Sequence, residues 1–134
     1  MYLLDTCVIS DFVKGDKATL SRIKTQSPLT LYLSSISVME IYYGLKRKPE
    51  KARLLHPIMN DFLETLQIIH FSDEDAMMAA GLRAELHRQG TPIGPYDILI
   101  AGTAIQNNLT LVTSNMKEFS RVTNLHSENW RISL

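Results

Sequence analysis

Cysteine pairs, histidine clusters and an excess of one charge are all missing from this chain of 134 residues. Its single cysteine, Cys7, excludes an internal disulfide and a cysteine-rich zinc site, and its 4 histidines lack the spacing of metal ligands. Lysine plus arginine equal aspartate plus glutamate at 14 each, so no overall positive charge indicates a nucleic-acid partner. Any such binding must come from a local cluster. The densest is GLKRKPEKAR at residues 44–53, a pattern more typical of a solvated helix end.

Long apolar runs are missing as well. The N-terminus has no basic segment and reaches a charge at Asp5 after only a few apolar residues, which predicts neither a signal peptide nor a membrane span. We therefore expect a cytoplasmic protein with no membrane partner. Because 45% of the residues are hydrophobic, the chain can bury a core of its own, and we expect a single domain over residues 1–134.

Short apolar runs alternate with longer segments of helical spacing. The predicted strands are residues 2–4, 29–35, 66–71 and 109–114, with a short edge strand near 125–130. The predicted helices are residues 8–25 in two pieces, 38–46, 50–65, 73–89 and 95–106. Strands without polar alternation are expected where helices cover both faces of a sheet. The predicted fold class is therefore α/β, a three-layer α/β/α sandwich around a mostly parallel sheet of four to five strands.

Four acidic residues lie where such a sheet gathers its ligands, beyond the carboxyl ends of the strands and at the following helix N-termini. They are Asp5, Glu40, Asp97 and Glu118. Carboxylates brought together repel one another and hold raised pKa values unless a cation neutralises them. Since no cysteine or histidine cluster is available, the oxygen donors favour Mg²⁺ or Mn²⁺. Such a site would perform phosphoryl-transfer chemistry.

Each acid also has a simpler explanation as a helix-capping group. Asp5 fits an N-cap, and Asp97 lies in a first turn, where a carboxylate is favourable against the helix dipole. Ser37 and Glu40 have the spacing of a capping box. Asn115 precedes Glu118 by the same spacing. Four separate capping roles at one edge of one sheet are less expected than a shared site.

Four segments carry a resemblance to a known family: YLLDTCVIS, SSISVMEIYYGL, GTPIGPYDILIAGTA, and TLVTSNMKEFSRV followed by ENW. They resemble PIN-domain ribonucleases, specifically VapC-type toxins of bacterial type II toxin-antitoxin systems, over nearly the whole chain. The resemblance implies an α/β/α sandwich with a Mg²⁺ or Mn²⁺ site that cleaves single-stranded regions of RNA. It also implies a cognate antitoxin that blocks this site, and a homodimer. By resemblance, Asp5, Glu40 and Asp97 are the core metal-site acids.

Two positions depart from the common pattern of that family. Many PIN domains have aspartate where this chain has Asn115, so Glu118 is expected to supply the fourth charge and Asn115 to orient water or bind phosphate. The toxins usually have asparagine where this chain has Cys7, and a thiol is only a weak donor. We expect Cys7 to be a small buried residue. Thr6 and Ser114 are candidate hydroxyl donors near the metal.

The sequence thus predicts a Mg²⁺- or Mn²⁺-dependent endoribonuclease toxin. Asp5 and Asp97 would hold the metal, while Glu40 and Glu118 complete its shell through water or position the attacking water. The expected products carry 5′-phosphate and 3′-hydroxyl ends.

Three alternatives remain open at this stage. An aspartyl-phosphate phosphatase would need an acid where Cys7 stands. A receiver-type signalling domain, which also binds Mg²⁺, would need a phosphoacceptor after a central strand, and the nearest acid after the third strand is Asp73. A catalytically degenerate PIN fold would bind RNA without cutting it, since Asn115 replaces an acid.

Overall fold

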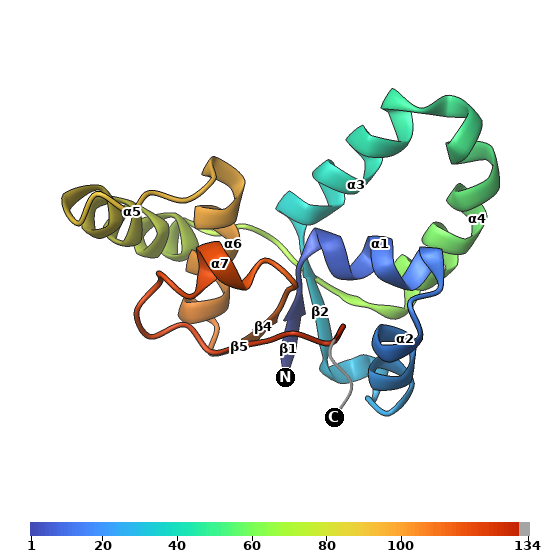
Figure 1. Ribbon diagram of the computed structural model, residues 1–134, viewed down its shortest axis with the longest axis horizontal. Helices are drawn as coiled ribbons and strands as arrows, with labels where there is room; N and C mark the ends of the chain where they lie inside the picture. The colour runs from blue at the N-terminus through green and yellow to red at the C-terminus, as the bar shows by residue number, and fades with distance from the viewer. Residues whose placement is uncertain (132–134) are drawn as a thin grey trace.

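Five short parallel strands form the central sheet of the computed structural model, which describes residues 1–131 (Figure 1). They are β1 (Tyr2–Leu4), β2 (Leu31–Ser34), β3 (Gln67–Ile69), β4 (Thr110–Val112) and β5 (Ser127–Glu128). Their order is β3-β2-β1-β4-β5, and every neighbouring pair is parallel. The predicted parallel α/β fold is confirmed, including the short edge strand near the C-terminus.

Helices cover both faces of this sheet. They are α1 (Thr6–Lys14), α2 (Lys17–Lys24), α3 (Ser35–Arg47), α4 (Pro49–Thr65), α5 (Asp73–Arg88), α6 (Pro95–Gln106) and α7 (Met116–Phe119), with a 3₁₀ turn, η1 (Pro28–Thr30). Figure 1 shows α1 to α4 on one side of the sheet and α5 to α7 on the other. The short helix α7 was not predicted. In residues 1–131, no helix has the length and apolar character needed to cross a membrane.

Local chemistry explains where the first helices begin and end. Gly15 adopts a left-handed conformation, φ 82°, that ends α1, and the Asp16 side chain then accepts a hydrogen bond from Thr19 N to start α2. The predicted division of residues 8–25 into two helices is therefore confirmed.

Helix α3 begins earlier than predicted. Ser34 Oγ accepts a hydrogen bond from Ile36 N at 3.0 Å and caps the helix three residues before the expected cap. Ser37 consequently lies inside α3, and its hydroxyl has no hydrogen-bond partner in the described part of the chain. The predicted capping box of Ser37 and Glu40 is wrong, which leaves the Glu40 carboxylate free of a capping role.

Two hydrophobic clusters sandwich the sheet because successive strand residues point to opposite faces. Leu4 packs with the α1 to α4 layer, where the Phe12 and Phe62 rings stack at 3.8 Å between centroids. Leu3 packs with the other layer, which includes Ile100 and Phe119. The doubly covered sheet holds the carboxyl ends of its central strands in fixed positions, and the candidate site lies there.

Close packing also fixes the helix that carries Asp97. A side chain at Gly102 of α6 would meet the backbone of Ala79 in α5, with an added Cβ only 2.9 Å from Ala79 N. The missing side chain lets the two helices approach closely. Asn107, at the end of α6, donates to the buried Asp75 of α5 at 2.9 Å. These contacts anchor α6 and hold its N-terminal turn at the sheet edge.

Candidate active site

Asp5 is the innermost acid of the site. It follows β1, is only 7% exposed, and caps α1 by accepting from Thr6 N at 2.8 Å. Its other oxygen, Oδ2, accepts from Thr113 Oγ1 at 2.8 Å and from the Cys7 thiol at 3.6 Å. Burial raises the pKa of Asp5, and these three hydrogen bonds oppose the shift. Asp5 is thus held in one orientation from three directions.

Glu40 approaches Asp5 from α3. Its Oε1 accepts from Thr6 Oγ1 at 3.1 Å, so one residue, Thr6, contacts both acids. Burial is the main reason that the pKa of Glu40 is raised, and the negative charge of Asp5 adds to it. The structure therefore brings together the two acids that follow β1 and β2.

Asp97 lies in the first turn of α6, directly after Pro95 and Tyr96. Its pKa is raised to about 7, first by burial and then by a hydrogen bond with Glu118. Nearby negative charges raise it further: Asp5, Glu118 and Glu40. Asp97 is therefore partly protonated near neutral pH because it is partly buried and lies beside other acids.

Glu118 completes the group from α7. Its Oε2 accepts from Asn115 Nδ2 at 2.7 Å, and this bond, followed by the one with Asp97, lowers the pKa of Glu118. Asn115 makes no side-chain cap to the backbone of α7, so the two residues pair through their side chains alone. Of this pair, Asp97 is the carboxyl that is more readily protonated.

The four predicted acids thus lie at one edge of the sheet, within electrostatic reach of one another. Over residues 1–131, no three acidic, histidine or cysteine side chains stand close enough to enclose an ion as placed. The donor set nevertheless fits a hard divalent cation, since every donor is a carboxylate oxygen.

The two predicted hydroxyl donors have different contacts. Thr6 Oγ1 donates to Glu40, whereas the backbone N and Oγ of Ser114 contact Cys7 Sγ at 3.5 and 3.4 Å. The hydroxyl that binds Asp5 belongs to Thr113, which sequence reasoning missed. The pairing of β1 with β4 places Leu4 opposite Val112, so the next residue of each strand meets at the sheet edge. Because a single sequence does not reveal this register, no sequence signal could have found Thr113.

Cys7 is half-buried and packs against the hydrophobic cluster on the α1 to α4 side, as expected for a small apolar residue. Burial and the neighbouring charge of Asp5 raise the pKa of its thiol. The thiol therefore stays protonated and acts as a weak donor to Asp5.

Strand order removes the receiver-type alternative. Asp73, the nearest acid after the third strand, lies exposed at the start of α5. Strand β3 is at the edge of the sheet, with β2 between it and β1. Asp73 therefore does not share a pocket with Asp5, as a phosphoacceptor would have to.

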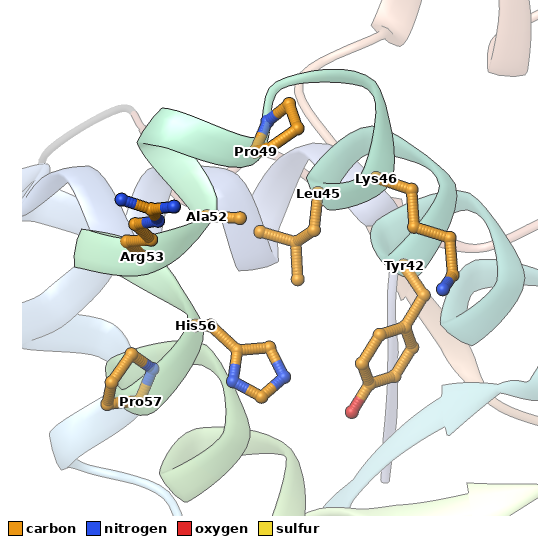
Figure 2. Close-up of a pocket in the computed structure, with 8 residues that line it drawn as sticks. All are labelled: Tyr42, Leu45, Lys46, Pro49, Ala52, Arg53, His56 and Pro57. Atoms are coloured by element: carbon orange, nitrogen blue, oxygen red, sulfur yellow. The ribbon is translucent and has the colours of Figure 1, made fainter.

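Several hollows border the α3–α4 hairpin, and one of them has an acid of the site in its lining. A cleft of about 250 Å³ between α1, α3 and α4 includes Thr6 and Glu40 in its lining. A larger groove of about 560 Å³ lies on the other side of the hairpin, where Figure 2 shows Tyr42 and His56 facing each other below Leu45. None of the four acids lines this larger groove.

Known proteins share this fold and this length. Residues 2–125 match the PIN domain family. Ribonuclease VapC2 of Rickettsia felis is 43% identical over 132 residues, which cover 97% of this chain and 98% of that protein. The tRNA(fMet)-specific endonuclease VapC of Salmonella typhimurium is 32% identical over 129 residues, covering 96% and 97%.

Solved structures of similar chains have the same fold. A chain of VapBC2 from Rickettsia felis, bound to a DNA fragment from their promoter, has a TM-score of 0.89 at 36% identity and covers 96% of this chain and 98% of its own length. A chain of FitAcB from Neisseria gonorrhoeae has a TM-score of 0.86 at 27% identity, covering 96% and 97%. The chain belongs to the PIN-domain family and, within it, to the VapC ribonuclease toxins of VapBC toxin-antitoxin systems.

Proposed function

We propose that this protein is a Mg²⁺- or Mn²⁺-dependent endoribonuclease that acts in the cytoplasm and hydrolyses RNA at the acid cluster. The single observation that carries the proposal is the gathering of four carboxylates at one edge of the sheet, where Thr6 contacts both Asp5 and Glu40. A bound cation would offset the repulsion between these charges. The ribonuclease names of the relatives support the same reaction class.

Asp5 and Asp97 would hold the ion, and Glu40 and Glu118 would complete its shell directly or through water. When bound, a divalent cation polarises the phosphate and makes water a better nucleophile. The chain's own contribution is to orient these carboxylates. Side-chain hydrogen bonds hold each one: Thr113 donates to Asp5, Thr6 to Glu40 and Asn115 to Glu118.

The proposed reaction is a direct hydrolysis. A water oxygen forms a bond to phosphorus, the bond between phosphorus and the ribose O3′ breaks, and the departing oxygen takes up a proton. The products carry 5′-phosphate and 3′-hydroxyl ends. Glu40 or Glu118 would accept the water's proton. Thr6 binds Oε1 of Glu40, which leaves its Oε2 available for this role.

A cognate antitoxin and a second copy of the chain are the proposed protein partners. Similar chains of known structure come from VapBC2 of Rickettsia felis, bound to a DNA fragment from their promoter, and from FitAcB of Neisseria gonorrhoeae. An acidic pocket attracts a basic side chain, so an antitoxin would block this site by placing an arginine or lysine among the acids. A monomeric mass in light scattering at micromolar concentration would contradict the proposed homodimer.

The test is cleavage of a total-RNA pool by purified protein with Mn²⁺, with EDTA, and with the variant Asp97→Asn. The matched control is Asp61→Asn, which makes the same chemical change at an exposed position of α4. We expect cutting by the wild type and by Asp61→Asn in Mn²⁺, and none in EDTA or with Asp97→Asn. Products with 2′,3′-cyclic phosphate ends would contradict direct water attack. Metal binding without any cutting would favour the degenerate RNA-binding alternative.

A further inference from the structure

The cleft between α1, α3 and α4 has an unusual lining. At one end lie Thr6 and Glu40 of the candidate site. Along its walls lie three exposed lysines, Lys14, Lys48 and Lys51. The cleft thus runs from a group of negative charges to a group of positive charges.

Ordinary helix chemistry explains two of these lysines. Lys14 lies in the last turn of α1 and Lys48 caps the C-terminus of α3, where a cation is favourable against the helix dipole. Lys51 lies in the first turn of α4, at the positive end of its dipole, where a cation is unfavourable. Among residues 1–131, no salt bridge includes any of the three lysines, so this part of the chain provides no partner for their charge.

Apart from Ser10, the rest of the lining is apolar. Ile41, Leu45, Leu55 and Met59 form much of the surface between the helices. Single-stranded nucleic acids are bound by grooves that combine cations for the phosphates with apolar or aromatic surface for the bases. An acidic site alone would repel a polyanion, so a cationic surface beside it would offset that repulsion for an approaching RNA strand.

We propose that this cleft binds the RNA strand next to the bond that is cut, with Lys14, Lys48 and Lys51 contacting phosphates and the apolar walls contacting a base or ribose. The strand would pass Thr6 and Glu40 to reach the acids. This inference rests on the proposed function, because it assigns the substrate path of the same site. The larger groove shown in Figure 2 also has cations at its rim, Lys46 and Arg53, but it does not reach the acids.

Gly44 offers a way to close the cleft without disturbing the fold. It lies inside α3 and lines the cleft, and a Cβ added there would have no protein atom within 4 Å. A larger side chain at this position would therefore occupy the cleft itself. Since glycine is a poor residue in a helix interior, Gly44→Met and Gly44→Ala should both melt at or above the wild-type temperature.

The first experiment measures binding of a fluorescent 12-nucleotide oligouridine in EDTA, where no cutting occurs, at several salt concentrations. The cleft variant is Lys48→Gln/Lys51→Gln. The control is Lys17→Gln/Lys24→Gln, which makes the same charge change on α2, below α1 in Figure 1. We expect the cleft variant to bind at least about tenfold more weakly, with a salt slope shallower by about 1.4, or about 0.7 for each lost phosphate contact. The control should match the wild type, and equal losses in both variants would overturn the proposal.

The second experiment compares the two substitutions of Gly44. Gly44→Met should weaken RNA binding several-fold and raise KM for cleavage in Mn²⁺, whereas Gly44→Ala should leave both unchanged. Wild-type binding by Gly44→Met would overturn the cleft as the RNA path. The proposed function is tested apart from this, because Asp97→Asn should lose cleavage and keep RNA binding. Loss of binding in the cleft variants of a protein that never cuts RNA would support the cleft while refuting the nuclease.

Discussion

Asp5 and Asp97 lie at the same edge of the sheet, but the two carboxylates differ in burial and in their hydrogen-bond partners. Asp5 is almost fully buried and accepts hydrogen bonds from Thr6, Thr113 and Cys7. Asp97 is partly exposed and contacts another acid, Glu118, with its pKa raised to about 7. Hydrogen-bond donors therefore orient the Asp5 carboxylate, whereas the Asp97 carboxyl lies against a second carboxyl, that of Glu118. We infer that Asp5 is the fixed part of the site and Asp97 the part that responds when a cation arrives.

The largest expected effect is the loss of RNA cleavage when either aspartate is replaced by asparagine. Asp5→Asn and Asp97→Asn should each reduce RNA cleavage by at least about a hundredfold, since both remove a carboxylate from the proposed metal site. Their stabilities should differ. In Asp5→Asn, the new amide would place a donor against existing donors and destabilise the fold. Asp97→Asn removes repulsion between carboxylates, so this variant should unfold at a urea concentration equal to or higher than that of the wild type, in EDTA at pH 8. Equal destabilisation by the two substitutions would contradict the proposed difference between Asp5 and Asp97.

Thr113→Val should give the next largest effect. The substitution leaves a buried carboxylate oxygen of Asp5 without its closest donor, which costs about 1 to 3 kcal/mol of unfolding free energy. Cleavage should also fall by about 10- to 100-fold because Asp5 loses its orientation. Thr110→Val, on the same strand, serves as the control in urea denaturation and in the cleavage assay. A loss of stability with unchanged activity would show that Thr113 is only structural.

The pH dependence of stability should follow Asp97. Its pKa is about 7 in the folded protein, against about 3.9 for an unfolded aspartate. Between these values the folded state binds more protons than the unfolded state, so the stability of the metal-free protein should fall as pH rises from about 4 to about 7. Asp97→Asn should flatten that part of the profile, measured by urea unfolding in EDTA. A wild-type stability that rises through this window would contradict the raised pKa.

Cys7→Ser should give the smallest effect. The thiol is a weak donor at 3.6 Å from Asp5, and a hydroxyl would preserve the donor while losing some apolar packing. We expect a change in unfolding free energy of about 1 kcal/mol or less and cleavage close to the wild-type rate. A large loss of activity would mean that Cys7, rather than Thr113, orients Asp5.

The sequence predicted the elements of the site better than their contacts. Alternating apolar strands and periodic helices placed Asp5, Glu40, Asp97 and Glu118 at one sheet edge, because the carboxyl ends of parallel strands meet there. The contacts depended on register, which a single chain does not reveal. Thr113 lies beside Asp5 only because Leu4 pairs with Val112.

Helix starts were the other source of error. Ser34, Ser35 and Ser37 are all plausible caps for the same helix, and the choice depends on where β2 ends. The structure uses Ser34, which moves Ser37 into the helix interior and removes Glu40 from its predicted capping role. The short helix α7 was missed because four residues carry too little periodicity to predict.

The most direct test of the acid cluster as a metal site is calorimetric titration of Mn²⁺ into the wild type, Asp97→Asn and Asp61→Asn at pH 8.0 and pH 5.5. We predict that the wild type and Asp61→Asn bind Mn²⁺ at pH 8.0 and bind it more weakly at pH 5.5, where Asp97 holds its proton. Asp97→Asn should bind at least about tenfold more weakly at pH 8.0. Absence of Mn²⁺ binding by the wild type, or equal binding by Asp97→Asn, would contradict the account.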